Sequence, residues 1–264
     1  MGILNLTPDS FSDGGRWAEH SRALDHAYEM LEAGADLIDI GGESTRPHST
    51  RITPGEEWDR IREVVTHLVN AGVVVSVDTL HAETARRCAQ AGVAIINDVS
   101  GGMWDSDMNT TVAHSECAYV IQRFHALPGD PNETFDHGHD VVATVLSRVL
   151  QQIEAACEAG VPQDRIIVDP GLGFSLTNEQ CWEIVHQTDR LCALGYPVLI
   201  GASRKRFLSL SPIADRDEAT VDITARVAKH GVWGVRVHDV PAHVACVRSM
   251  GQEKTGGVCH DGQA

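Results

Sequence analysis

Short apolar runs alternate along the chain with longer segments in which apolar residues recur at every third or fourth position. The runs are typical of buried strands, and the longer spacing is typical of amphipathic helices. A glycine follows most of the helical segments and comes just before the next apolar run, where it would end the helix. Such joints occur at Gly34, Gly72, Gly92, Gly160, Gly195 and Gly231.

This pattern predicts about eight strand–helix units. We expect strands over residues 3–6, 36–40, 73–77, 93–96, 118–121, 165–168, 197–200 and 234–237. We expect helices over residues 21–33, 56–70, 81–90, 107–115, 141–159, 179–194, 218–230 and 242–250. Polar, turn-forming residues follow the first strand up to Gly15, as in a loop at the mouth of an active site.

The predicted strands are almost continuously apolar, which is typical of a parallel sheet buried on both faces. Strict strand–helix alternation over 264 residues then favours a single (β/α)8 barrel of the TIM type. A doubly wound open sheet is the alternative, but Asn5-Leu6-Thr7 stands where that fold carries its glycine-rich phosphate turn. No linker divides the chain, so we expect the barrel over residues 1–251 and a flexible polar tail over 252–264.

Composition narrows the classes of protein to consider. Hydrophobic residues make up 42%, which suffices for a sizeable core, and no run is long enough for a transmembrane helix. We see no signal-peptide pattern and therefore expect a cytoplasmic protein. The net charge of −16 argues against nucleic acid as a partner. Seven scattered cysteines without a C-x-x-C spacing predict buried thiols rather than disulfides or a zinc site.

Polar residues stand where the apolar runs end. In a barrel the carboxyl ends of all strands meet at one face, which carries the active site. A helix N-cap would explain a single aspartate such as Asp98 or Asp239, but not the whole set. The residues that we expect to converge there are Asn5, Thr45, Asp78, Asn97, Asp169, Ser203, Lys205, Arg236 and His238.

Two kinds of chemistry occur in this set. Asp78, Asn97 and Asp169 suit a ligand rich in N–H donors, such as an aminopyrimidine, because a carboxylate can accept two parallel hydrogen bonds. Arg236 and His238 stand two residues apart, so both side chains should point to the same face of the strand.

Together with Lys205, Arg236 and His238 are cationic or nearly so and suit phosphate oxygens. Asn5 suits a pyrophosphate that carries Mg²⁺, an ion that takes few protein ligands beside phosphate and water. The residues alone therefore suggest a donor-rich ring joined to a pyrophosphate.

Seven segments in the same order resemble the dihydropteroate synthases of the pterin-binding enzymes: residues 1–15, 39–47, 76–79, 96–102, 169–174, 201–208 and 236–240. The resemblance implies a (β/α)8 barrel. It also implies an enzyme that condenses a dihydropterin pyrophosphate with 4-aminobenzoate, giving dihydropteroate and pyrophosphate. A Mg²⁺ cofactor, a homodimer and sensitivity of the family to sulfonamides belong to the same expectation.

The resemblance also assigns roles to the converging residues. The pterin would be bound by Asp78, Asn97, Asp169 and Lys205, of which Asp78, Asp169 and Lys205 would be catalytic. The pyrophosphate would be bound by Asn5, Arg236 and His238, with Asn5 as the metal ligand. The 4-aminobenzoate would contact Thr45, Pro47, Phe174 and Ser203. The opening loop and residues 43–50 would be the loops that close over the substrates.

The chain departs from the family pattern at the rim of the expected pterin pocket. Gln122 and Arg123 stand where many members have Met-His, and Leu176 stands where a lysine is common. These departures keep a second interpretation open, a pterin-binding paralogue without turnover. A pterin-dependent methyltransferase on the same barrel is a third, but it would have no use for cations that bind pyrophosphate.

Overall fold

The computed structural model describes residues 1–7, 15–47 and 49–255; for 15–19 and 251–255 only the backbone is considered. The described chain alternates between strands and helices as expected. The strands are β1 (Gly2–Asn5), β2 (Ile38–Gly41), β3 (Val75–Asp78), β4 (Ile95–Asp98), β5 (Ala118–Gln122), β6 (Ile166–Asp169), β7 (Leu199–Ile200) and β8 (Gly234–Val235).

The strands follow one another around a ring in sequence order. Strands β1 to β6 form one parallel sheet, and β7 pairs with β8 in a second. Isolated parallel bridges join the two sheets at both edges, Val168 to Val198 and Gly2 to Val237. The ring therefore closes, which confirms the barrel and excludes the open sheet.

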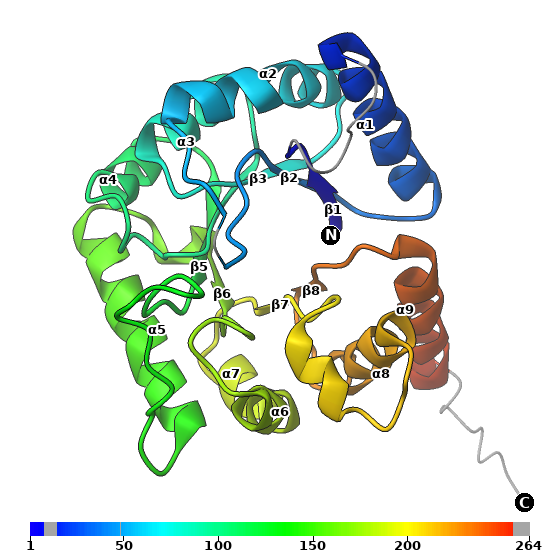
Figure 1. Ribbon diagram of the computed structural model, residues 1–264. Helices are drawn as coiled ribbons and strands as arrows, with labels where there is room; N and C mark the ends of the chain where they lie inside the picture. The colour runs from blue at the N-terminus through cyan, green and yellow to red at the C-terminus, as the bar shows by residue number, and fades with distance from the viewer. Residues whose placement is uncertain (8–14, 48, 256–264) are drawn as a thin grey trace, which may run out of the picture.

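The helices lie outside the ring of strands (Figure 1). They are α1 (Gly15–Glu32), α2 (Pro54–Asn70), α3 (Ala82–Gln90), α4 (Met108–Ala113), α5 (Val141–Glu158), α6 (Asn178–His186), α7 (Thr188–Cys192), α8 (Arg216–Ala228) and α9 (Val240–Thr255). One predicted helix was wrong: residues 179–194 form α6 and α7, because Gln187 between them has φ −113° and ψ 31°, outside the helical region.

Local sequence signals fix several helix ends. Thr53 and Glu56 form a capping box at the start of α2, and Thr177 and Gln180 do the same for α6. All six glycines predicted to follow helices have positive φ, between 78° and 102°. These glycines end the helices as expected, since a side chain would be strained there.

Two apolar layers hold the barrel together. The outer layer packs strands against helices and includes Ile40, Val77 and Val237. The inner layer fills the half of the barrel away from the carboxyl ends of the strands. It consists of Leu37, Ile95, Val120, Ile167 and Leu199, while polar residues occupy the end where the strands finish. This division leaves the carboxyl end of the barrel for chemistry.

Other features of the described residues bear on the sequence-based expectations. None of the described helices is both long and apolar enough to cross a membrane. The six described cysteines are all free thiols, and Cys88, Cys117 and Cys181 are buried. Helix α9 continues to Thr255, four residues into the expected tail, and 256–264 lie outside the described residues.

Candidate active site

Three expected site residues lie on one rung of the sheet. In the strand pairing, Asn5 stands opposite Gly41, Gly41 opposite Asp78, and Asp78 opposite Asn97. Residues on one rung of a parallel sheet point to the same face, here the inside of the barrel. The Asn5 Oδ1 atom lies 3.5 Å from where a Cβ on Gly41 would stand, which places the Asn5 amide directly beside β2.

Asp39 is the central acceptor of the site, and the sequence analysis gave it no role. It lies two residues before Gly41 on β2 and is fully buried. Its carboxylate accepts hydrogen bonds from Ser76 Oγ at 2.6 Å and from Asn97 Nδ2 at 3.2 Å. The sequence did carry a signal for Asp39. It is an acidic residue inside an apolar run, and it stands two residues before the end of the strand, so it shares a face with that end.

Arg236 joins the first three strands to the last. Its Nε donates to Asp39 at 2.5 Å and its Nη2 donates to Asp78 at 2.8 Å. Val235 and Val237 face the helices, as the alternation predicted. The carboxylates on either side raise the pKa of Arg236 further above its usual range, against the effect of burial, so the guanidinium is always charged.

The Asp78 carboxyl is the titratable group of this cluster. Its side chain is 14% exposed, and burial raises its pKa to about 7 even though the Arg236 guanidinium acts in the opposite direction. A carboxyl in this range changes its charge near neutral pH. It can therefore respond strongly to a ligand that donates hydrogen bonds to it.

Asp169 and Lys205 converge from β6 and from the loop after β7. Asp169 Oδ1 accepts the backbone N–H of Gly171 at 2.7 Å, and a Cβ on Gly201 would lie 3.6 Å from Asp169 Oδ2 and 3.9 Å from Lys205 Nζ. Burial raises the pKa of Asp169 and lowers that of Lys205, and each charge partly opposes the shift of the other. Lys205 Nζ also donates to the carbonyl of Leu172.

A turn separates the basic residues of the Ser-Arg-Lys segment. Arg204 has φ 59°, in the left-handed region, and its guanidinium pairs with Asp217 on α8 at 2.9 Å while remaining 53% exposed. This turn lets Ser203 and Lys205 face the barrel. Of the two basic residues, Arg204 and Lys205, only Lys205 brings a charge to the site.

His238 and Ser203 form a pair at the same mouth. The backbone N–H of His238 donates to Ser203 Oγ at 3.3 Å, and a second hydrogen bond of 2.8 Å joins Ser203 Oγ to His238 Nδ1. Burial, assisted by Arg204 and Arg236, lowers the pKa of His238 to about 4. The sequence suggested a nearly cationic His238, whereas this lowered pKa favours a neutral imidazole with one ring N–H that can donate.

The residues that depart from the family pattern are all buried. Gln122 stands opposite Asp169 in the strand pairing, so its side chain points to the inner face of the barrel mouth. Gln122 donates to the carbonyl of Val99 at 3.1 Å, and Leu176 packs in the core beside α6. The Arg123 side chain is 2% exposed and lies beneath the loop that carries Phe174. Phe174 itself packs in a small cluster with Leu80 and Val99, and its ring lies 5.0 Å from Lys205 Nζ.

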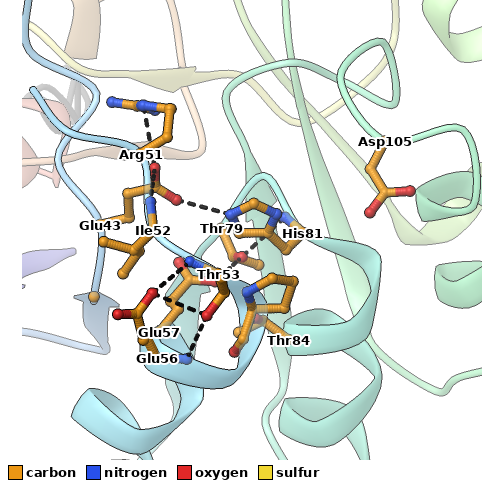
Figure 2. A network of polar contacts seen from close by, with 12 residues as sticks. Glu43, Arg51, Ile52, Thr53, Glu56, Glu57, Thr79, His81, Thr84 and Asp105 are labelled. Carbon is orange, nitrogen blue, oxygen red and sulfur yellow. Dashed lines mark hydrogen bonds and ion pairs between the residues drawn. The ribbon is translucent and has the colours of Figure 1, made fainter. Parts of the chain in front are cut away.

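The segment after β2 is tied to the start of α3 by an ion pair that the sequence analysis also missed (Figure 2). The Glu43 side chain is 4% exposed and accepts from His81 Nε2 at 2.9 Å and from Arg51 Nε at 3.2 Å. The Glu43 hydrogen bond raises the pKa of His81. This pair holds the segment that bears Thr45 and Pro47.

A second buried carboxylate supports the same region. Thr79, the residue after Asp78, donates to Glu57 on α2 at 2.7 Å and accepts the backbone N–H of His81 at 3.1 Å. Burial raises the pKa of Glu57. Through Thr79 and His81 the end of β3 is thus connected to the Glu43 segment.

The structure brings most of the expected site together. Hydrogen bonds, ion pairs, strand pairing or close approach place eight expected residues at one mouth: Asn5, Asp78, Asn97, Asp169, Ser203, Lys205, Arg236 and His238. Thr45 and Pro47 lie on the adjoining segment without a side-chain hydrogen bond within the described residues. Most of the opening loop, residues 8–14, lies outside the described residues.

Comparison with known proteins agrees with this geometry. The family model for pterin-binding enzymes matches residues 1–238. The chain is 41% identical to the dihydropteroate synthase of Mycobacterium leprae over 260 residues, which cover 95% of this chain and 92% of that one.

Two solved structures are also similar. The dihydropteroate synthase of Clostridium difficile, crystallised in the presence of pteroic acid, gives a TM-score of 0.89 at 34% identity and covers 96% of this chain and 95% of its own. That of Anaplasma phagocytophilum with bound 6-hydroxymethylpterin monophosphate gives 0.86 at 37%, with 96% and 97% covered. The chain therefore belongs to the pterin-binding enzymes and, within them, to the dihydropteroate synthases.

Proposed function

We propose that the residues at the barrel mouth condense 6-hydroxymethyl-7,8-dihydropterin pyrophosphate with 4-aminobenzoate, giving 7,8-dihydropteroate and pyrophosphate. The observation that carries this proposal is the alternation of buried carboxylates and cations around one mouth. Asp39, Asp78 and Asp169 alternate there with Arg236 and Lys205. Such a site offers acceptors to a donor-rich ring and donors to phosphate oxygens at one end of the barrel.

The pterin ring is assigned to Asp78, Asn97, Asp169 and Lys205. Both aspartates are poorly solvated, and their raised pKa values record that burial disfavours the charged form. A ring that donates N–H groups to them would stabilise the carboxylates and would itself gain charge-assisted hydrogen bonds. The same carboxylates favour positive charge on the ring as the bond to pyrophosphate breaks.

The leaving group is assigned to Asn5, Arg236 and His238. When the C–O bond breaks, the bonding electrons leave with the pyrophosphate. The Arg236 guanidinium and the ring N–H of His238 can stabilise that charge as donors. Arg236 must share its N–H groups between the phosphate and the two carboxylates that it already contacts.

The charge balance of the mouth fits a bound Mg²⁺. Three carboxylates face two cations there, and His238 is neutral, so the side chains alone cannot balance a pyrophosphate. The Asn5 side chain makes no hydrogen bond within the described residues, which leaves its amide oxygen for the metal. Bound Mg²⁺ would supply positive charge to the phosphate oxygens.

The second substrate is assigned to the rim formed by Thr45, Pro47, Phe174 and Ser203. The amine of 4-aminobenzoate would attack the methylene carbon with its lone pair. No described side chain is positioned as an obvious base for its proton, so the protein acts mainly by placement and exclusion of water. The family also leads us to propose a cytoplasmic homodimer, which light scattering at micromolar concentration would test.

A pyrophosphate-release assay with both substrates tests the proposal directly. Release should depend on both substrates, and dihydropteroate should form in equal amount. Asp169→Asn keeps the shape but replaces an anionic acceptor, so pterin affinity should fall at least about tenfold. Pterin binding without pyrophosphate release would instead support the paralogue without turnover.

A further inference from the structure

Arg123 is a buried cation for which the reaction offers no use. It follows β5, and its side chain is 2% exposed. Its Nε and Nη2 donate to the backbone carbonyls of Pro170 and Phe174, which are neutral. Its Nη1 has no hydrogen-bond partner, and within the described residues it forms no ion pair. A buried charge that meets only neutral acceptors is costly and calls for an anion.

A small cavity lies beside this guanidinium. Its volume is about 80 Å³, and Arg123, His125, His137 and Arg148 line it together with Asp136. The lining residues come from the end of β5, from the long loop that follows, and from α5. A water molecule occupies about 30 Å³ in the liquid, so the cavity has room for a phosphate-sized group.

Two guanidinium groups and one carboxylate line the cavity. Burial lowers the pKa of Arg123 to about 10, and the nearby Arg148 guanidinium contributes in the same direction, so Arg123 is still charged at neutral pH. Burial lowers the pKa of His137, and Arg123 adds to that effect. Asp136, the acidic lining residue, accepts the backbone N–H of Gly138 at 3.0 Å and forms no ion pair with either arginine.

We propose that this cavity binds a free tetrahedral oxyanion, phosphate or sulfate, between Arg123 and Arg148. The oxyanion would accept from the unpaired Arg123 Nη1 and would relieve the repulsion between the two guanidinium groups. Arginine suits this role because its guanidinium remains charged and carries N–H donors for oxyanion oxygens. The site lies behind the Phe174 loop and uses none of the residues assigned to the substrates.

Anion binding should also steady the Phe174 loop. Arg123 holds the carbonyls of Pro170 and Phe174, and His137 Nε2 donates to the carbonyl of Ser175 at 2.6 Å. The walls of the cavity are thus the anchors of this loop. An effect on 4-aminobenzoate binding would rest on the proposed function, whereas anion binding itself can be measured without substrates.

Thermal unfolding in phosphate or sulfate, against chloride at equal ionic strength, tests the site. At about ten times the dissociation constant, the anion should raise Tm by roughly 3–6 °C. Arg148→Gln should remove most of this rise. Arg62→Gln on α2, 49% exposed, removes the same charge far from the cavity and should retain the rise. Any anion at Arg236 and Lys205 would affect both variants equally.

Crystals soaked in sodium selenate give an independent reading. We expect anomalous density between Arg123 and Arg148 in the wild type, and none in Arg148→Gln. Water alone in the wild-type cavity at saturating selenate would refute the proposal. So would an equal rise in Tm for Arg148→Gln and Arg62→Gln. Either result would leave the proposed reaction unaffected.

Discussion

Asp39 shows how single residues at the mouth serve structure and ligand together. It is fully buried on β2, and its charge is balanced by Arg236 from the far side of the ring. Breaking a buried ion pair from one side costs about 3–5 kcal/mol, because the remaining charge stays unpaired. Arg236 therefore stabilises the barrel even before any phosphate arrives.

The pH dependence of pterin binding should follow Asp78. Its pKa rises from 3.8 to about 7 in the folded protein, so ionisation of Asp78 lowers the free energy of unfolding as the pH rises through that window. A ring that donates to the ionised carboxylate should bind more tightly as the pH rises toward 7. Below that, affinity should fall up to about tenfold per pH unit.

Calorimetric titration of 6-hydroxymethyl-7,8-dihydropterin across this range measures the effect. Asp78→Asn should bind weakly, and its affinity should not vary in the same window. If the variant and the wild type show the same dependence on pH, the titrating group lies elsewhere and Asp78 does not bind the ring.

Arg236→Ala separates the structural from the ligand-binding role of this side chain. Stability should fall by about 3–5 kcal/mol, because Asp39 is left unpaired. Affinity for the pterin pyrophosphate should fall about tenfold more than affinity for the hydroxymethyl pterin, because a charged hydrogen bond contributes roughly 1.5–3 kcal/mol. Ser76→Ala, which removes another hydrogen bond to Asp39, is the control and should lower stability alone. Equal losses for both ligands would leave Arg236 a purely structural role.

At this scale the sequence predicted the polar strand ends but not their partners. Asp78, Asn97, Asp169 and Lys205 could be found because each interrupts or ends an apolar run. The pairing of Arg236 with Asp39 joins residues 197 positions apart and depends on ring closure. The lowered pKa of His238 was also out of reach, since burial and the positions of Arg204 and Arg236 decide it.

At the scale of elements, the segment after β2 and the start of α3 act as one unit. Figure 2 shows Glu43 between Arg51 and His81, with Thr79 close to His81. Strand β3 thus connects the Asp78 carboxylate with the segment that carries Thr45 and Pro47. The C-terminal ends of the helices were mostly predicted, because the glycines that follow them are a local signal.

The division of α6 from α7 shows the limit of such signals. Apolar residues keep helical spacing across the break, and only the dihedral angles of Gln187 depart from the helix. The Thr188 hydroxyl donates to the carbonyl of Val185 at 2.8 Å, which provides a hydrogen bond for one carbonyl near the end of α6. Periodicity averages over many residues and does not detect a change at a single one.

His81→Ala should weaken binding of 4-aminobenzoate rather than of the pterin. Without its partner, the buried Glu43 carboxylate would release the segment, and KM for 4-aminobenzoate should rise about tenfold. His81→Gln keeps a donor and should restore most of the loss. His20→Gln removes a similar His–Glu pair, 2.7 Å long, from α1 and α2 and serves as the control.

The same pair should add a pH dependence to this step. The Glu43 hydrogen bond raises the pKa of His81, so the charged pair is complete below about 6.5 and is lost as the pH rises through the raised value. Initial-rate kinetics should therefore show KM for 4-aminobenzoate rising at alkaline pH in the wild type. The same rise in His81→Gln would contradict this role for the pair.

At the scale of the whole molecule, the fold was the most predictable property. Alternating strands and helices without a linker are compatible with few architectures. In a closed barrel every strand has a neighbouring strand on both sides. Closure itself rests on the bridges at Val168–Val198 and Gly2–Val237, which no local pattern marks. The burial of Gln122, Arg123 and Leu176 could not be predicted from the linear sequence, although Gln122 lies on the same rung as Asp169 at the mouth.

The net charge of the whole molecule should affect binding of the pyrophosphate ester. The protein carries −16, and its mouth holds more carboxylates than cations, so a pyrophosphate ester meets repulsion both at long range and at the site. Mg²⁺ should therefore be needed for tight binding of the pyrophosphate form, but not of the hydroxymethyl pterin. Removing Mg²⁺ with EDTA should weaken the pyrophosphate form at least about tenfold and leave the other ligand unchanged.

Ionic strength separates the two sources of repulsion. The screening length falls from about 30 Å at 0.01 M salt to about 10 Å at 0.1 M, so added salt should speed association of the pyrophosphate form by weakening the long-range field. Added salt should not replace Mg²⁺, because the charges at the mouth lie within a few ångströms of the ligand.

Asn5→Leu should raise the Mg²⁺ concentration needed for half-maximal binding of the pyrophosphate form. The affinity for the hydroxymethyl pterin should change little. Stopped-flow binding at several salt and Mg²⁺ concentrations measures all three effects, and tight binding of the pyrophosphate form in EDTA would show that the side chains suffice without a metal.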